Sequence, residues 1–106
     1  MESGKPVMCG GSMPHAVDDR VVEITQKMKP LVEKKYETTF STFKPVACLS
    51  QVVAGLNYFV KVETDKGTYH LRVYDRFGDL QLTDVKEATA EEDLIYFYHP
   101  LFNKQL

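Results

Sequence analysis

The residues of this chain that most often carry out catalysis are its histidines and cysteines. His15, His70 and His99 are far apart, and none has the spacing to other ligand residues that metal sites usually show. Cys9 and His70 are compatible with a nucleophile and its base, but Cys9 stands in a glycine-rich segment that offers no preorganisation. No glycine-rich phosphate loop follows a predicted strand and opens a helix. The sequence therefore predicts neither an enzyme nor a bound metal or cofactor.

An apolar stretch lies between two predicted strands, where a hairpin turn is expected. Turns are normally built from Gly, Asn, Asp and Ser because they face water. Either these apolar side chains form an exposed tip that binds a partner, or they continue a buried strand and the turn falls on residues 55–57. Periodicity alone leaves both interpretations open. The stretch consists of Gln51, Val52, Val53, Ala54 and Gly55.

Composition and charge restrict the class of protein. The 106 residues are 43% hydrophobic and 26% charged, which is typical of one soluble globular domain spanning residues 1–106. The net charge is −2, with basic and acidic residues interspersed, so neither nucleic acid nor a membrane is expected as a partner. The first 30 residues contain no apolar run like the core of a signal peptide, and we expect a cytoplasmic protein.

The two cysteines do not form a secreted disulfide framework. Cys48 alternates with Val46 in an apolar strand and is expected to be buried. Cys9 is expected to be an exposed thiol that can link two chains on oxidation.

The elements that must position these residues begin with one helix. Residues 1–14 have many glycines and prolines and no period, and they are predicted to form a flexible arm. After them, apolar residues recur at steps of three and four, which predicts one face of a helix. Pro30 lies within this pattern and is expected to kink the helix without dividing it. The predicted apolar face consists of Val17, Val21, Ile24, Met28 and Leu31.

Everything after the helix favours strands. Alternation of apolar and polar residues predicts strands around 42–50, 57–63, 69–74 and 80–85, with a short last strand at 94–98. Turns are expected at residues 65–67 and 75–79. The predicted fold class is α+β, with one long N-terminal helix packed across a curved antiparallel sheet.

The apolar stretch also matches a known signature. Residues 51–55 have the form Gln-X-Val-X-Gly of the cystatins, and residues 57–59 follow as in that family. The chain resembles most closely the stefins, the type-1 cystatins, in residues 8–11, 29–31, 70–73 and 94–97 as well. Several motifs in the right order make this resemblance specific.

The resemblance implies a reversible, tight-binding, non-covalent inhibitor of papain-like cysteine proteases. Three segments would fill the active-site cleft: the arm, the first hairpin and the second hairpin. The second hairpin is shorter than in stefins and lacks their Leu-Pro, so a cystatin-fold interaction module with little protease affinity remains the alternative. The expected contact residues are Met8, Cys9, Gly10, Gln51, Val52, Val53, Ala54, Gly55, Phe77 and Gly78.

Two further hypotheses concern the class of protein and its oligomeric state. A redox enzyme that depends on Cys9 is the third functional alternative. The chain is expected to be a monomer. The alternative is a dimer, formed either by exchange of the first hairpin between two chains or by a disulfide through Cys9.

Overall fold

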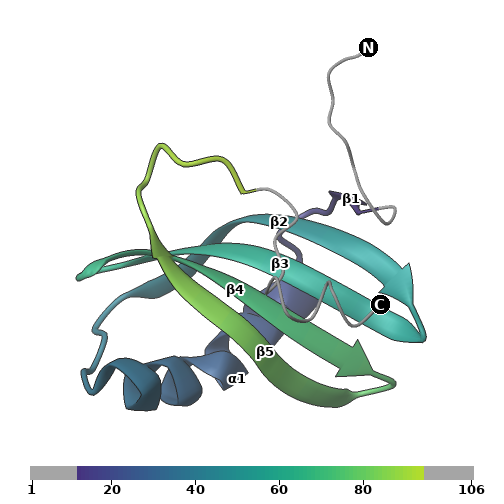
Figure 1. Cartoon of the computed structure of the whole chain (residues 1–106), viewed down its shortest axis with the longest axis horizontal. Coiled ribbons are helices and arrows are strands. Elements are labelled where there is room, and N and C mark those ends of the chain that lie inside the picture. Colours follow the sequence, from purple (N-terminus) through teal and green to yellow (C-terminus); the bar gives the residue numbers. More distant parts are fainter. Residues whose placement is uncertain (1–11, 95–106) are drawn as a thin grey trace, which may run out of the picture.

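A helix and a sheet form two layers in the computed structural model, which describes residues 12–94. The elements are β1 (Met13–Pro14), α1 (Asp19–Tyr36), β2 (Phe43–Val53), β3 (Gly55–Thr64), β4 (Gly67–Arg76) and β5 (Asp79–Ala88). The strands form one sheet in the order β1-β2-β3-β4-β5, and every neighbouring pair is antiparallel. In Figure 1, α1 lies across one face of this sheet. The predicted α+β fold is confirmed.

Local capping residues determine where α1 begins and ends. Asp18 is the N-cap, and its Oδ1 accepts a hydrogen bond from the backbone N–H of Val21 at 3.0 Å. At the other end Glu37 takes a left-handed conformation, with φ of 53°, and closes the helix. The helix continues through Pro30, so the expectation of one helix is confirmed.

The predicted buried face of the helix is partly wrong. Val17 precedes the helix, and Leu31 is 46% exposed, whereas Val32 is fully buried beside Val21, Ile24 and Met28. An α-helix turns by about 100° per residue, so Val32 lies only about 20° from Val21 but Leu31 about 80° away. The sheet therefore covers Val32 and leaves Leu31 in solvent.

The core lies between α1 and the facing side of the sheet. Alternate residues of β3 and β4 point toward the helix and are buried there, as the period of two predicts. Aromatic side chains close the core near the end of α1, where the ring centroids of Tyr36 and Tyr69 are 5.0 Å apart. The buried core residues of β3 and β4 are Tyr58, Val60, Val62, Tyr69, Leu71 and Val73.

A β-bulge changes the side-chain alternation of β2. The register shifts between Pro45 and Ala47, so Val46 is the extra residue and is partly exposed. The predicted alternation of Val46 with Cys48 on one buried face is therefore wrong for Val46. Cys48 is buried as expected, and burial raises the pKa of its thiol to about 12. The Cys48 thiol consequently stays protonated and unreactive at neutral pH.

The last residues of the predicted arm are paired with the sheet. Met13 and Pro14 pair with Ser50 and Leu49 of β2, and Ser12 is buried. A two-residue strand carries no readable period, which is why the sequence did not reveal it. Residues 1–11, with Met8, Cys9 and Gly10, lie outside the described residues, as do positions 95–98 of the predicted last strand.

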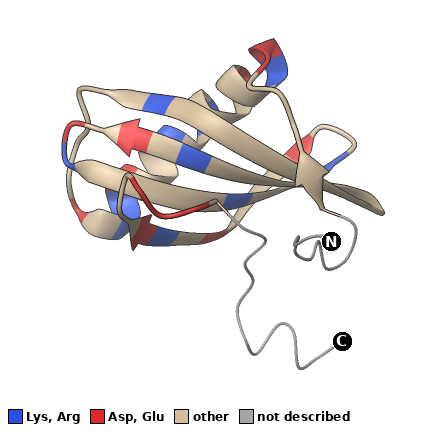
Figure 2. Ribbon diagram, turned by 90° about the horizontal axis from the view of Figure 1, so that it is seen from above, with Lys and Arg blue, Asp and Glu red and all other residues tan. Residues whose placement is uncertain are grey.

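Charged side chains are mixed over the surface. Figure 2 shows acidic and basic positions interspersed along the helix and the strands. Within residues 12–94, no helix combines the length and the apolarity that crossing a membrane requires.

Ile24 and Val22 provide a matched test of the helix packing. Ile24 is fully buried against the sheet, and Val22 is 41% exposed on the same helix. Ile24→Ala should lower the free energy of unfolding by about 2–5 kcal/mol, because it leaves a cavity in the core. Val22→Ala should change the free energy by less than about 0.5 kcal/mol. Urea denaturation measures both, and equal effects would contradict the burial of Ile24 against the sheet.

Candidate functional site

The first hairpin ends in an exposed apolar tip. Val53 pairs with Gly55, which leaves Ala54 at the turn between β2 and β3. Val52 is 78% exposed and Val53 42%. The interpretation as an exposed tip is confirmed, and a buried strand with its turn at residues 55–57 is wrong because those residues belong to β3. The uncharged tip stays in solvent although its hydration is unfavourable.

Gln51 supports this tip from below. Its side chain is only 8% exposed, and its Oε1 accepts a hydrogen bond from Nδ2 of Asn57 at 3.0 Å across the hairpin. A buried amide pair of this kind holds the two strands in register just before the tip. Of the residues expected at the first hairpin, Gln51 therefore lies inside it, while residues 52–54 are exposed.

Gly55 allows the first hairpin to lie against β4. Its φ is +119°, a region that residues with a side chain rarely adopt. A Cβ atom at this position would lie 2.5 Å from the backbone oxygen of Asp75, so only glycine fits. Nearby, the hydroxyl of Tyr74 donates a hydrogen bond to the backbone oxygen of Ala54. The tip is thus tied to the neighbouring strand as well as to its own hairpin.

The second hairpin turns through only Phe77 and Gly78. Both residues have positive φ, +54° and +99°, which is the pattern of a type I′ turn between antiparallel strands. The expected turn at residues 75–79 is confirmed. Phe77 is 87% exposed, and the left-handed conformation costs about 1–2 kcal/mol for a residue with a side chain.

Asp75 connects this turn to the start of α1. Its Oδ1 accepts a hydrogen bond from the backbone N–H of Gly78 at 2.8 Å, and its Oδ2 accepts one from Nη2 of Arg20 at 2.9 Å. The hydrogen bond to Asp75, with a second one to Glu23, raises the pKa of Arg20. Asp75 lies one residue before the four-residue turn at 76–79, and the sequence gives no signal of a partner 55 residues away.

The two hairpin tips lie side by side at one end of the sheet (Figure 1). Leu56 pairs with Asp75, which brings the two turns to the same level. Residues of both hairpins line a hollow of about 420 Å³ between them. Of the expected contact residues, the structure brings residues 52–55 and Phe77 together around this hollow, whereas Gln51 and Gly78 do not line it. The hollow is lined by Val52, Val53, Ala54, Gly55, Leu56, Asp75 and Phe77.

His15 anchors the segment that leads to this end of the molecule. Its backbone N–H donates to the oxygen of Cys48 at 2.9 Å, and its Nδ1 lies 3.1 Å from Oγ of Ser50. Its Nε2 lies 3.6 Å from Oδ2 of Asp18, so the ring bridges β2 and the helix cap. Since β1 is antiparallel to β2, the chain runs from Met13 back to Ser12 in the direction of the first tip. No sequence feature had assigned His15 this role.

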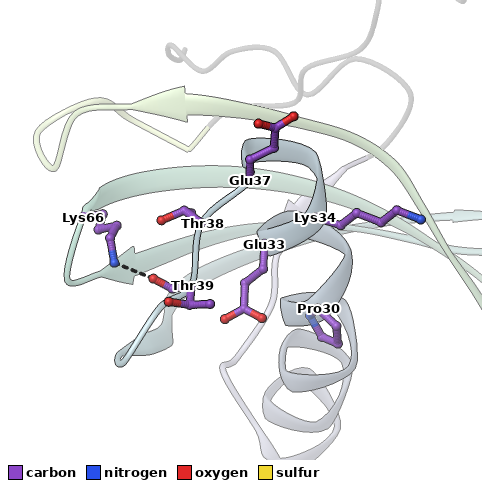
Figure 3. Close-up of a pocket in the computed structure, with 7 residues that line it drawn as sticks. All are labelled: Pro30, Glu33, Lys34, Glu37, Thr38, Thr39 and Lys66. Carbon is purple, nitrogen blue, oxygen red and sulfur yellow. Dashed lines mark hydrogen bonds between the residues drawn. The ribbon is translucent and has the colours of Figure 1, made fainter.

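A larger hollow, of about 710 Å³, lies at the opposite end of the molecule. Figure 3 shows its residues around the end of α1 and the β3–β4 turn, where Nζ of Lys66 donates to the backbone oxygen of Thr39 at 2.5 Å. The neighbouring Asp65 accepts hydrogen bonds from the backbone of Thr42 and Ser41, which lower the pKa of Asp65 to about 2. These polar groups hold the α1–β2 connection in place.

Residues 12–94 contain no cluster of three or more His, Cys, Asp or Glu side chains that could hold a metal ion. His70 is buried, and burial lowers its pKa, so its imidazole is neutral at pH 7.

Comparison with known proteins gives the same class. Residues 10–94 match the cystatin domain. The chain is 40% identical to cystatin-A3 of Dictyostelium discoideum over 94 residues, which cover 85% of this chain and 100% of that protein. It is 34% identical to stefin-2 of Mus musculus over 101 residues, covering 91% and 98%. It is 37% identical to leukocyte cysteine proteinase inhibitor 1 of Sus scrofa over 75 residues, covering 70% and 73%.

A helix packed on an antiparallel sheet, with two adjacent hairpin tips, is the cystatin-like α+β arrangement. The chain belongs to the cystatin family, and its resemblance to the stefins is confirmed. Cystatins are inhibitors of cysteine proteases and not enzymes.

Gly55→Ala tests the close approach of the two hairpins, with Gly67→Ala as its control. Gly67 has a similar φ, +128°, but a Cβ atom there meets nothing within 4 Å. Both changes should destabilise through backbone strain, by about 1–3 kcal/mol. Only Gly55→Ala should also shift the NMR signals of residues 74–76, because its methyl group displaces Asp75. Identical spectral changes in the two variants would contradict the contact.

Proposed function

We propose that this chain is a reversible, tight-binding, non-covalent inhibitor of papain-like cysteine proteases, such as cysteine cathepsins. The observation that carries the proposal is the exposed, uncharged tip at residues 52–54, held rigid by Gln51, Gly55 and Tyr74. A rigid apolar tip enters a preformed cleft with little loss of conformational entropy and without desolvating a charge. Membership of the cystatin family supports the same target class.

The second part of the proposed surface is the turn at Phe77 and Gly78. Phe77 takes the place of the apolar Leu-Pro contact that this shortened hairpin lacks. Its exposure and its position on the hollow between the tips support this role. The first hairpin and Phe77 would then contact the protease together.

The third part is the N-terminal arm, with Met8 and Cys9 as side-chain anchors. The described residues begin at Ser12, just before the two residues that pair with β2 near the first hairpin. An arm that contacts the protease next to the first hairpin would have to start at this point. Gly10 lets the chain turn away before a peptide bond reaches the catalytic cysteine of the protease. The inhibitor would therefore block the cleft without being cleaved.

The proposed working form is a cytoplasmic monomer. Similarity to stefin-2 supports the expectation of a stefin-type protein. Exchange of the first hairpin or a disulfide through Cys9 would produce a dimer. Size-exclusion chromatography with and without reductant distinguishes these states, and a dimer at all concentrations would contradict the monomer.

Papain titration tests the function, and two matched substitutions test the site. The unmodified chain should abolish hydrolysis of a small peptide substrate at near-stoichiometric amounts. Val52→Asp should weaken inhibition at least about tenfold, because it puts a charge into an apolar contact. Leu31→Asp, which adds the same charge on the exposed helix face, should inhibit like the unmodified chain.

If the rate of substrate hydrolysis by papain is unchanged at micromolar concentrations of the unmodified chain, the proposed function is contradicted. That result would favour the alternative, a cystatin-fold interaction module with little protease affinity. Thermal stabilisation of the chain by inactivated papain provides a second measure of binding that does not depend on the substrate.

Gly10→Glu tests the arm. The added side chain should prevent the arm from turning away from the catalytic centre, so inhibition of papain should weaken by a factor of at least about ten. The thermal unfolding midpoint should stay unchanged, because Gly10 precedes the paired residues. Gly4→Glu, which puts the same charge ahead of the matching motif, is the control. Equal inhibition by both variants would remove the arm from the mechanism.

A further inference from the structure

We propose that Asp75 is a positioning residue for protease binding: held by Arg20, it fixes the second turn so that Phe77 stands beside the first tip as a second apolar anchor. This inference rests on the proposed function and extends it. It assigns the shortened hairpin a definite role and explains how a turn of two residues supplies a contact.

The choice of residue at position 77 is the first observation. A type I′ turn favours Asn-Gly, because asparagine tolerates positive φ better than other residues with side chains. Phe77 combines an unfavourable backbone conformation with an almost fully exposed aromatic ring. Neither feature stabilises the folded chain. A large aromatic side chain at an exposed tip is instead typical of residues that dominate binding energy at interfaces.

The second observation is that both carboxylate oxygens of Asp75 are engaged. One accepts from Gly78 inside the turn, and the other accepts from Arg20 at the start of α1. The Asp75 side chain is only 10% exposed, so both bonds are partly shielded from water. Nη1 of Arg20 also donates to Oε1 of Glu23 at 2.9 Å, which orients the guanidinium group. The turn is therefore fastened to the helix and not only to its own strands.

The third observation concerns the backbone of Asp75. Its carbonyl oxygen occupies the space that a side chain on Gly55 would need, so it touches the base of the first hairpin. One residue thus connects the first tip, the second turn and the helix. With these connections, the distance between Val52 and Phe77 is set before a partner arrives, and binding loses less conformational entropy.

The hollow between the tips indicates the chemistry of the partner. Val52, Val53, Leu56 and Phe77 give it an apolar rim, and the charge of Asp75 is already paired. We therefore expect an uncharged, apolar side chain at the rim of the protease cleft to enter between the tips. A charged group there would lose its hydration without finding a partner.

Phe77→Asn separates binding from folding. Asparagine suits the left-handed conformation, so the thermal unfolding midpoint should stay equal or rise. Inhibition of papain should weaken at least about tenfold, because the aromatic contact is lost. A role of Phe77 confined to the fold would lower the midpoint instead. Unchanged inhibition by Phe77→Asn would overturn the inference.

A double-mutant cycle then tests whether Asp75 acts through Phe77. In the chain with Phe77, Asp75→Ala should weaken inhibition about tenfold. In the Phe77→Asn chain the same change should weaken it less than about threefold, because there is no ring left to position. Asp75→Asn keeps an acceptor for Gly78 but lacks the charge that Arg20 pairs with. In the chain with Phe77, it should therefore weaken inhibition less than Asp75→Ala does.

Asp65→Ala is the matched control, because Asp65 also accepts backbone hydrogen bonds but lies at the opposite end of the sheet. It should leave inhibition unchanged. Near-ultraviolet circular dichroism checks that each variant is folded at the assay temperature.

The outcomes distinguish this inference from the function on which it rests. If the unmodified chain inhibits papain and Asp75→Ala costs the same factor with and without Phe77, only the positioning role is overturned. If the unmodified chain does not inhibit papain, the proposed function fails, and this inference fails with it.

Discussion

The close contact between Gly55 and the backbone oxygen of Asp75 is the constraint on which the binding end of this molecule depends. It lets β3 and β4 carry their turns at the same level, with a hydrogen bond from Tyr74 to Ala54 across them. Asp75 can then hold Gly78 with one carboxylate oxygen and Arg20 with the other. Because one backbone contact aligns both hairpins, two separate turns become a single surface.

This surface is stabilised by parts of the molecule that do not belong to it. Exposed Val52 and Phe77 add nothing to the hydrophobic stabilisation of the fold, and Phe77 carries backbone strain as well. The buried stripe of α1 and the facing residues of β3 and β4 supply the stabilisation that permits this. Functional surfaces are the places where a chain departs from the arrangement that is most stable locally.

Much of the fold was predictable because its signals are local. The period of the helix, the alternation in β3 and β4, and the turn residues at 65–67 and 75–79 each depend on neighbours in the chain. The predictions from sequence were wrong where contacts with a distant part of the chain determine the structure. The sheet selects Val32 over Leu31, the pairing with β3 makes Val46 a bulge, and β2 orders Met13 and Pro14.

The candidate site, like the fold, was predictable from the sequence only in part. An apolar stretch ending in Gly55, a turn containing Phe77 and Gly78, and the family signature are all present in the order of residues. Tertiary structure alone decided that Val52 faces solvent while Gln51 turns inward, and that Arg20 meets Asp75 across 55 positions. The physical reason is that chain connectivity determines which neighbours share a face, whereas strand register and helix packing determine which distant groups come within bonding distance.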